Sequence, residues 1–422
     1  MAAQSLKPAL QGMPRSATLA INELSGQLQA EGRNIFRFGL GQSPFPVPDR
    51  VVEALREHAG EKDYLAVEGL PALRSAVADF HRLRDGADFD PSGVLVGPGS
   101  KELMFLLQLA FDGDLLVPTP CWVSYGPQAR MLGHQAVRLP TERRDRWRLR
   151  PEQLDAHCKA EGDRPRLLIL NYPGNPDGIT YSPEELAALA EVARRHGILV
   201  LSDEIYGLVH HRGEHVSIAP MYPEGTIVSG GLSKWCGAGG WRLGTFAFPD
   251  QLSWLREAMA SAASETYTSV CAPVQYAAIT AFQGGPDIER YLTDSRRILS
   301  ALGQHVANRL REAGVQVEAP EGGFYLWLDL QELADPLKAR GIADGNTLCE
   351  AVLRDVGVAI LPGSAFERPE GELTARLAYV DFDGAVLLNE LRQGAALDDT
   401  LLRSTCPSIF QGVDVLADWI GG

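Results

Sequence analysis

Near its middle the chain reads Ser229-Gly230-Gly231-Leu232-Ser233-Lys234-Trp235-Cys236-Gly237-Ala238-Gly239-Gly240-Trp241-Arg242-Leu243-Gly244. A lysine amine can form a Schiff base with an aldehyde, and a guanidinium can bind a phosphate. The glycines would let backbone amides approach that phosphate closely. Ser233, Lys234 and Arg242 are therefore candidates for holding a phosphorylated cofactor that carries an aldehyde. Taken alone, the segment fits a solvated turn equally well.

An apolar run at residues 198–201 reads as a buried strand and is followed by Ser202-Asp203-Glu204-Ile205-Tyr206. The ends of such strands are where α/β sheets place functional groups. Asp203 could keep a pyridinium nitrogen protonated, and Tyr206 could donate to a ring oxygen. Alternatively, Asp203 and Glu204 could be the cap and first-turn acid of a following helix.

Two further strand predictions lead into glycine-containing turns. The run at 168–170 continues as Asn171-Tyr172-Pro173-Gly174-Asn175-Pro176-Asp177-Gly178, which could aim the Asn175 amide at a ring oxygen or be only a tight turn. The run at 94–96 leads through Gly99 into a helix predicted to reach Phe111. A helix N-terminus binds phosphate readily, so Gly99, Ser100 and Lys101 are candidates for a phosphate seat. Ser100 could equally be a cap, and the missing third glycine argues against NAD.

Taken together, these segments resemble the fold-type I pyridoxal-phosphate enzymes, specifically the class I and II aminotransferase family. The resemblance extends from about Gly39 to Val380. It implies an α/β fold, in which a three-layer α/β/α large domain with a mostly parallel sheet is joined to a smaller α+β domain. It also implies an enzyme that moves the amino group of an α-amino acid to a 2-oxo acid, with pyridoxal 5'-phosphate as cofactor.

The resemblance assigns a role to each candidate. Lys234 matches the Schiff-base lysine that also moves a proton. Asp203 matches the partner of the pyridine nitrogen, while Asn175 and Tyr206 match donors to the ring oxygen. The phosphate-cup positions correspond to Gly99, Ser100, Lys101, Ser233 and Arg242, and Trp122 corresponds to the aromatic residue stacked on the ring. Without the resemblance, a Trp packed in the core would be the better reading of Trp122.

Substrate binding is implied mainly for Arg376, which matches the arginine that grips the α-carboxylate. A planar guanidinium binds a carboxylate through two parallel hydrogen bonds. On an alternating strand, however, an arginine more often faces solvent. Gly41, Asn175 and Phe324 match other positions of the substrate pocket. Lys101 could read a distal carboxylate, although a solvated helix lysine is the more frequent case.

A homodimer with shared active sites is also implied. Tyr64 resembles a tyrosine that reaches the phosphate of the partner subunit. Thr268 and Ser269 resemble a second contribution across that interface.

Composition limits the remaining function classes. A chain of 422 residues with 45% apolar content can bury a large core. Its formal charge of −15 disfavours nucleic acid and anionic membranes as partners. The six cysteines lack metal-type spacing and the nine histidines form no helical ligand pair, so we expect free thiols and no catalytic metal. The start of the chain has no secretion signal, and no apolar run has membrane length, so we expect a cytoplasmic protein.

The order of the predicted elements divides the chain into three parts. Strands are expected at 94–96, 115–117, 167–170, 198–201, 227–229 and 245–248, and a long helix from 286 to about 313. Further strands are expected at 315–318, 324–328, 358–361 and 376–380, then a terminal helix and a tail from 385 onward. The predicted parts are 1–48, which joins the small domain, 49–290, the large cofactor-binding domain, and 291–422, the small domain.

Two other functions remain open at this point. A lyase, decarboxylase or oxidase acting at Cα or Cβ of an amino acid would use the same cofactor-binding groups. A non-catalytic regulatory module that binds the cofactor is the third reading. Such a module would be expected to carry a DNA-binding segment, and no basic helix-turn-helix pattern precedes Gly39.

Overall fold

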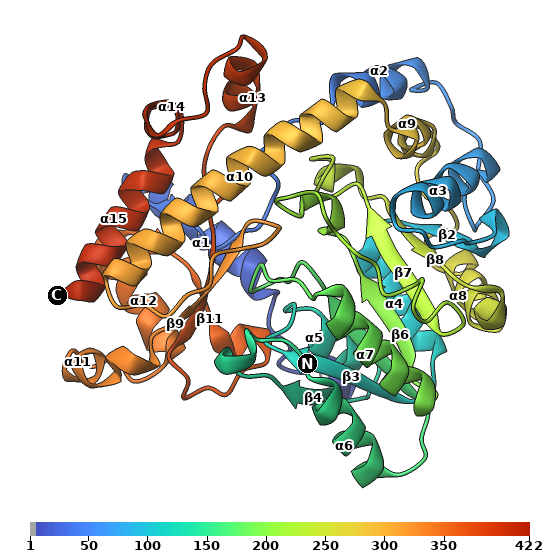
Figure 1. The fold of residues 1–422 in the computed structure, drawn as a ribbon, viewed down its shortest axis with the longest axis horizontal. Helices are drawn as coiled ribbons and strands as arrows, with labels where there is room; N and C mark the ends of the chain where they lie inside the picture. The colour runs from blue at the N-terminus through green and yellow to red at the C-terminus, as the bar shows by residue number, and fades with distance from the viewer. Residues whose placement is uncertain (1–5) are drawn as a thin grey trace, which may run out of the picture.

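The computed structural model describes residues 6–422, and its centre is a seven-stranded sheet (Figure 1). The strand order is β2-β8-β7-β6-β5-β3-β4, and β8 runs antiparallel to both its neighbours while the other pairs are parallel. The strands are β2 (Val94–Gly97), β3 (Asp114–Thr119), β4 (Val137–Pro140), β5 (Arg166–Asn171), β6 (Leu199–Asp203), β7 (Thr226–Gly231) and β8 (Gly244–Ala247). The six strands predicted for this part are confirmed to within one or two residues at most ends, and β4 was not predicted.

Side chains alternate along each strand between two apolar layers, as the pleat requires. On β5, Leu167 and Ile169 pack with α4 (Ser100–Ala110) and α8 (Ser253–Ser264). Leu168 and Leu170 pack on the other face with α6 (Pro151–Glu161) and α7 (Pro183–Arg195). That second face continues under α3 (Pro71–Arg84) and α9 (Ala272–Gln283). The three-layer α/β/α arrangement is therefore confirmed.

The C-terminal part is reached along α10 (Pro286–Glu312), one continuous helix that spans the predicted boundary at residues 290 and 291 (Figure 1). It holds an antiparallel sheet in the order β11-β12-β9. These strands are β9 (Tyr325–Asp329), β11 (Leu361–Pro362) and β12 (Thr374–Ala378). Around them lie α11 (Ala334–Ala339), α12 (Gly345–Val356), α13 (Gly384–Arg392), α14 (Asp399–Thr405) and α15 (Pro407–Gly421).

The N-terminal segment packs on this C-terminal part. It contains α1 (Ala17–Ala30) and β1 (Phe36–Arg37), and β1 pairs in parallel with β10 (Val358–Ala359). After it, α2 (Asp49–Glu57) returns to the large sheet beside α9. The division at residue 48 stays a prediction, and the β1–β10 pair supports it. No helix within residues 6–422 is both long enough and apolar enough to cross a membrane.

Three predictions for the C-terminal part were wrong. The segment 315–318 is not a strand, because Val315 and Val317 are buried as their alternation predicts but Gln316 forms only an isolated bridge with Asp329. The segment 358–361 is two short strands in different sheets, since β10 pairs with β1 and β11 with β12. From residue 385 onward the chain holds three helices, where one helix and a tail were expected.

Candidate active site

A cavity of about 440 Å³ opens where β5, β6 and β7 end. The register places Asn171, Asp203 and Ser229 side by side on these strands, and Lys234 follows β7 after a short turn. The predicted residues that line this cavity are Gly41, Ser100, Lys101, Trp122, Asn175, Asp203, Tyr206, Ser233, Lys234, Arg242 and Arg376. The structure thus brings together residues that are up to 335 positions apart in the chain.

Asp203 is a buried carboxylate held by two hydroxyl groups. The Tyr125 hydroxyl donates to Asp203 Oδ2 at 2.6 Å, and Ser229 Oγ donates to Oδ1 at 3.3 Å. Burial raises the pKa of Asp203 to about 6, and the hydrogen bonds from Tyr125 and Ser229 lower it again in part. The helix-cap reading of Asp203 was wrong, because β6 is followed by a turn and the short 3-10 helix Gly207–Val209.

Lys234 reaches into the same cavity from the other side. Its Nζ donates to the Gly41 carbonyl oxygen at 2.9 Å and lies 5.4 Å from the centre of the Tyr206 ring. The Tyr206 hydroxyl pairs with that of Tyr325 at 2.8 Å. A side chain at Gly41 would place its Cβ 2.0 Å from the Tyr325 hydroxyl oxygen, so this position requires glycine. Phe324 does not line the cavity but lies behind Lys234, with its ring centre 5.7 Å from Nζ.

The third side of the cavity is cationic. Arg242 donates from Nη1 to the Gly239 carbonyl at 2.9 Å, and Lys101 Nζ stands 5.1 Å from the centre of the Trp122 ring. Burial lowers the pKa of Lys101, and so do the charges of Arg242 and Lys234. Within residues 6–422, none of these three cations forms an ion pair with a carboxylate. Such a cluster, with the first turn of α4 beside it, fits an anionic group.

The first turn of α4 is built around glycine. Gly99 has a φ of +89° and is the residue before the helix, so the reading of Ser100 as the cap was wrong. A Cβ on Gly99 would stand 2.2 Å from Arg242 Nη2. The glycine therefore lets the guanidinium reach the end of α4, although Gly99 itself does not line the cavity.

Arg376 is a buried charge that forms no ion pair with any residue in the range 6–422. It lies on β12 and is 1% exposed, so the solvent-facing reading was wrong. Its Nη1 donates to Asn175 Oδ1 at 3.0 Å, and Nη2 donates to the Gly39 carbonyl. Its Cζ lies 4.6 Å from the centre of the Tyr325 ring. Burying an unpaired charge is costly, so this guanidinium is suited to a carboxylate that enters the cavity.

The residues predicted to reach a partner subunit lie outside this cavity. Tyr64 is 88% exposed, and Thr268 has a φ of +62°. A contact of Tyr64, Thr268 and Ser269 across a dimer interface stays a prediction.

Several functional residues escaped the sequence reasoning. Tyr125 stands three positions after Trp122 but carries no motif of its own. Asn171 joins the strand ends, because its side chain donates to the Asp203 carbonyl at 2.9 Å and accepts from the Asn175 amide at 2.8 Å. Thr18 of α1 also lines the cavity, and no local signal could have placed it there.

The family model described as "Aminotransferase class I and II" matches residues 33–379. The chain belongs to this family. This aminotransferase is 33% identical over 374 residues to an aspartate aminotransferase of Geobacillus stearothermophilus, covering 86% of this chain and 91% of the relative. It is 30% identical over 378 residues to an asparagine–oxo-acid transaminase of Streptococcus mutans, covering 87% and 92%. A solved structure, an aspartate aminotransferase from Thermus thermophilus with maleate, superposes with a TM-score of 0.84 at 27% identity and covers 98% of this chain and 99% of that one.

These matches confirm the predicted family, the fold and an aminotransferase activity. The family also implies pyridoxal phosphate as cofactor. The role of each side chain follows from its charge and its contacts in the cavity.

Proposed function

We propose that this aminotransferase uses pyridoxal 5'-phosphate, held by Lys234, to move the amino group of an acidic α-amino acid to a 2-oxo acid. The observation that carries the proposal is that two cations face one cavity and neither forms an ion pair with a carboxylate among residues 6–422. Lys234 has no carboxylate partner there, and Arg376 is buried without one. One amine that can bond an aldehyde and one guanidinium that can bind a carboxylate are the two contacts that transamination needs.

The residues around Lys234 fit the cofactor on the grounds of charge. Arg242 would hold the phosphate, together with Ser233 and the first turn of α4, whose backbone includes Ser100 and Lys101. Asp203 would accept a hydrogen bond from the ring nitrogen. The hydrogen bonds from Tyr125 and Ser229 hold its carboxylate in place. Asn175 and Tyr206 would donate to the ring oxygen, and Trp122 would cover the ring.

When bound, pyridoxal phosphate supplies an aldehyde and an electron-withdrawing ring, and the protein supplies position and protons. Lys234 Nζ would be the base that removes the proton from Cα of the amino donor and, in the reverse half-reaction, the acid that delivers a proton to Cα of the amino acid formed from the 2-oxo acid. Arg376 would bind the α-carboxylate. This contact sets the orientation of Cα and so determines which of its bonds faces Lys234. Asp203 must be ionised to stabilise a positive ring nitrogen. Binding of the cofactor should therefore weaken as the pH falls through the pKa of Asp203 in the cofactor-free protein.

An acidic side chain is favoured by the charge next to the substrate position. Lys101 lines the cavity, carries no carboxylate partner in the described part of the chain, and stands over Trp122. The names of the relatives, which include aspartate aminotransferases, point the same way. The Lys101→Met variant should therefore raise KM for aspartate more than KM for alanine. Lys159→Met, which removes an exposed α6 lysine paired with Asp155, is the matched control.

The proposal includes a homodimer in which Tyr64 reaches the partner's phosphate site. The exposure of this tyrosine in the single chain supports the idea, since a large aromatic side chain is rarely left so exposed. Sedimentation equilibrium would test the dimer. Loss of cofactor from Tyr64→Ala without loss of the fold would test the contact. A cytoplasmic location also belongs to the proposal and rests on composition.

The test of the cofactor assignment is the absorbance of the purified protein. We expect a band from the bound cofactor that changes when L-aspartate is added alone and returns when a 2-oxo acid follows. Lys234→Ala should lose this behaviour. Consumption of the amino acid without any lasting change in the band would instead favour a lyase, decarboxylase or oxidase.

A further inference from the structure

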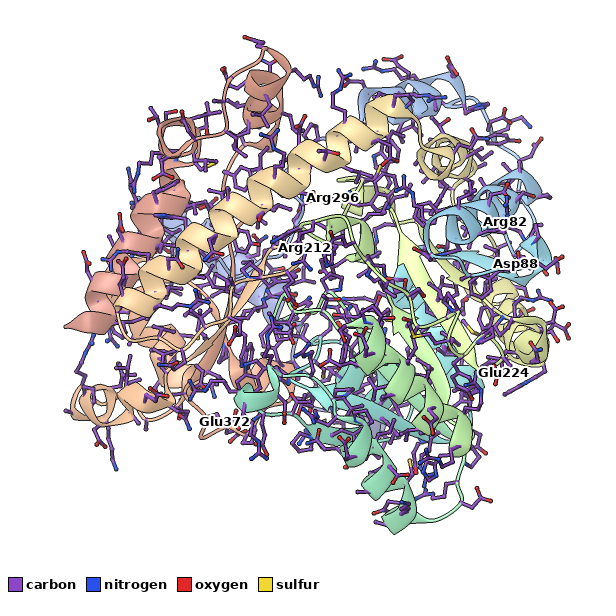
Figure 2. The ribbon with its side chains drawn as sticks, viewed as in Figure 1. Arg82, Asp88, Arg212, Glu224, Arg296 and Glu372 are labelled. Carbon is purple, nitrogen blue, oxygen red and sulfur yellow. The ribbon has the colours of Figure 1, made fainter. Side chains whose placement is uncertain are left out.

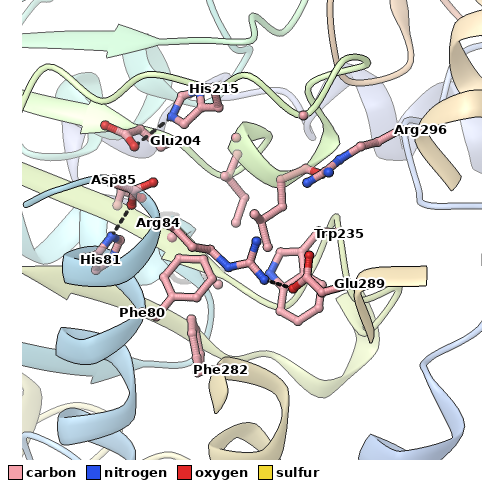
Figure 3. Close-up of a pocket in the computed structure, with 17 residues that line it drawn as sticks. Phe80, His81, Arg84, Asp85, Glu204, His215, Trp235, Phe282, Glu289 and Arg296 are labelled. Carbon is pink, nitrogen blue, oxygen red and sulfur yellow. Dashed lines mark hydrogen bonds and ion pairs between the residues drawn. The ribbon is translucent and has the colours of Figure 1, made fainter. Parts of the chain in front are cut away.

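A second cavity, of about 270 Å³, lies beside the catalytic one (Figure 3). Its walls come from α3, α9, α10 and the turn after β6. Ile205 lines both cavities, so they are direct neighbours. Nothing in the proposed transamination uses this second space, which we call the rear cavity.

The rear cavity is lined by charged side chains, most of which are already paired. The three pairs are His81–Asp85 at 2.8 Å, Glu204–His215 at 2.9 Å and Arg84–Glu289. Arg296 is the exception. Its Nε donates to the Leu208 carbonyl at 2.8 Å, and within residues 6–422 its two Nη atoms have no hydrogen-bond partner and no carboxylate at ion-pair distance.

Arg296 is directed into this space and partly shielded from water. It comes from the side of α10 that faces the sheet (Figure 2), and Figure 3 shows its guanidinium beside Arg84, Trp235 and Glu289. Burial lowers its pKa, and the nearby charge of Arg84 lowers it further. A free pair of Nη donors in such a setting matches a carboxylate, which accepts two parallel hydrogen bonds.

The opposite wall offers a carboxylate for a cation. Asp85 uses only Oδ2 to pair with His81, and its side chain is 11% exposed. Its other oxygen can accept from an ammonium group. Phe80, Phe282 and Trp235 supply apolar surface between the two walls. The cavity thus combines a guanidinium, a carboxylate and an aromatic wall.

We propose that the rear cavity binds a small zwitterion, an α-amino acid, with its carboxylate on Arg296, its ammonium at Asp85 and its side chain against the aromatic wall. An occupant would lie against groups that border the catalytic site. Ser229 lines the rear cavity and donates to Asp203, and Trp235 directly follows Lys234. The binding itself does not rest on the proposed transamination.

The test is the number of sites for 2-aminoisobutyrate, an amino acid with no hydrogen on Cα, measured by equilibrium dialysis on the holoenzyme. We expect two sites per chain. Arg296→Leu should weaken the rear site by roughly 10- to 100-fold, as expected for a lost hydrogen bond to a charged group. Arg297→Leu is the matched control. Arg297 directly follows Arg296 on α10, is exposed and pairs with Asp294. This variant should keep both sites.

Further variants separate the possible failures. Arg376→Lys should weaken binding of 2-aminoisobutyrate at the catalytic site and leave binding in the rear cavity unchanged. If the proposed function were wrong, the wild type would show a single site, and Arg296→Leu would abolish it. Asp85→Asn should weaken binding of 2-aminoisobutyrate but not of isobutyrate, which lacks the ammonium. A single site that survives Arg296→Leu with an unchanged melting temperature would overturn the proposal. If the rear cavity bound isobutyrate as tightly as 2-aminoisobutyrate, the proposal that it binds a zwitterion would be wrong.

Discussion

The Tyr125→Phe substitution removes one hydroxyl group from Asp203 and leaves the aromatic ring in place. The hydroxyl donates at 2.6 Å to a fully buried carboxylate, whose pKa burial raises to about 6. A hydrogen bond to a charged group contributes about 1.5–3 kcal/mol, and one pKa unit corresponds to about 1.4 kcal/mol. Loss of the bond should therefore raise the pKa of Asp203 from about 6 to between roughly 7 and 8.

The assay is the pH dependence of cofactor binding, measured as the dissociation constant of pyridoxal phosphate for the cofactor-free protein. Because Asp203 must be ionised to accept from a positive ring nitrogen, binding weakens on the acidic side of its pKa, and the variant should lose affinity at a higher pH than the wild type. Tyr172→Phe is the control, since it removes another buried hydroxyl that bonds to Ser202 and not to Asp203. An acidic limb that stays in place in Tyr125→Phe, with the fold intact, would show that the Tyr125 hydroxyl does not set this pKa.

Two other substitutions test the site and its surroundings. Arg376→Lys should raise KM for the amino acid by roughly 30- to 5000-fold and change kcat less, because truncating one partner of a buried charge pair costs about 2–5 kcal/mol. An unchanged KM would show that Arg376 does not bind the substrate. Burial raises the pKa of Asp177 from 3.8 to about 7, so its ionisation destabilises the fold progressively as the pH rises from about 4 through 7. Asp177→Asn keeps an acceptor for the Ile179 amide and should gain stability relative to the wild type between pH 5 and pH 8, by up to roughly 4 kcal/mol in urea unfolding. If Asp177→Asn changed the free energy of unfolding equally at pH 5 and pH 8, Asp177 would not be a buried group that ionises in this pH range.

The large domain could be predicted because its local signals agree with its packing. The apolar runs that lead into Asn171 and Asp203 proved to be sheet strands whose polar ends line the cavity. The C-terminal part was harder to predict because the chain changes sheets at Ile360, between the two-residue strands β10 and β11. Two of its helices begin directly after capping aspartates, Asp383 before α13 and Asp398 before α14, and such residues predict where a helix starts.

The contacts that tune the site could not be read from spacing. Tyr125 is the first residue of α5 (Tyr125–Met131), and only the tertiary packing of that helix brings its hydroxyl to Asp203. The same holds for Arg376, whose strand gives no sign that its guanidinium is buried. The rear cavity depends on Arg296, which in the sequence is one charged residue among many on a long helix.

Transfer of the amino group by this chain can be tested by following the nitrogen atom itself. We would incubate the holoenzyme with 15N-labelled L-aspartate and unlabelled 2-oxoglutarate and analyse the products by mass spectrometry. We expect 15N-labelled glutamate and oxaloacetate in equal amounts, with neither product formed by Lys234→Ala. Release of labelled ammonia or of carbon dioxide, without labelled glutamate, would contradict it and favour a lyase, oxidase or decarboxylase.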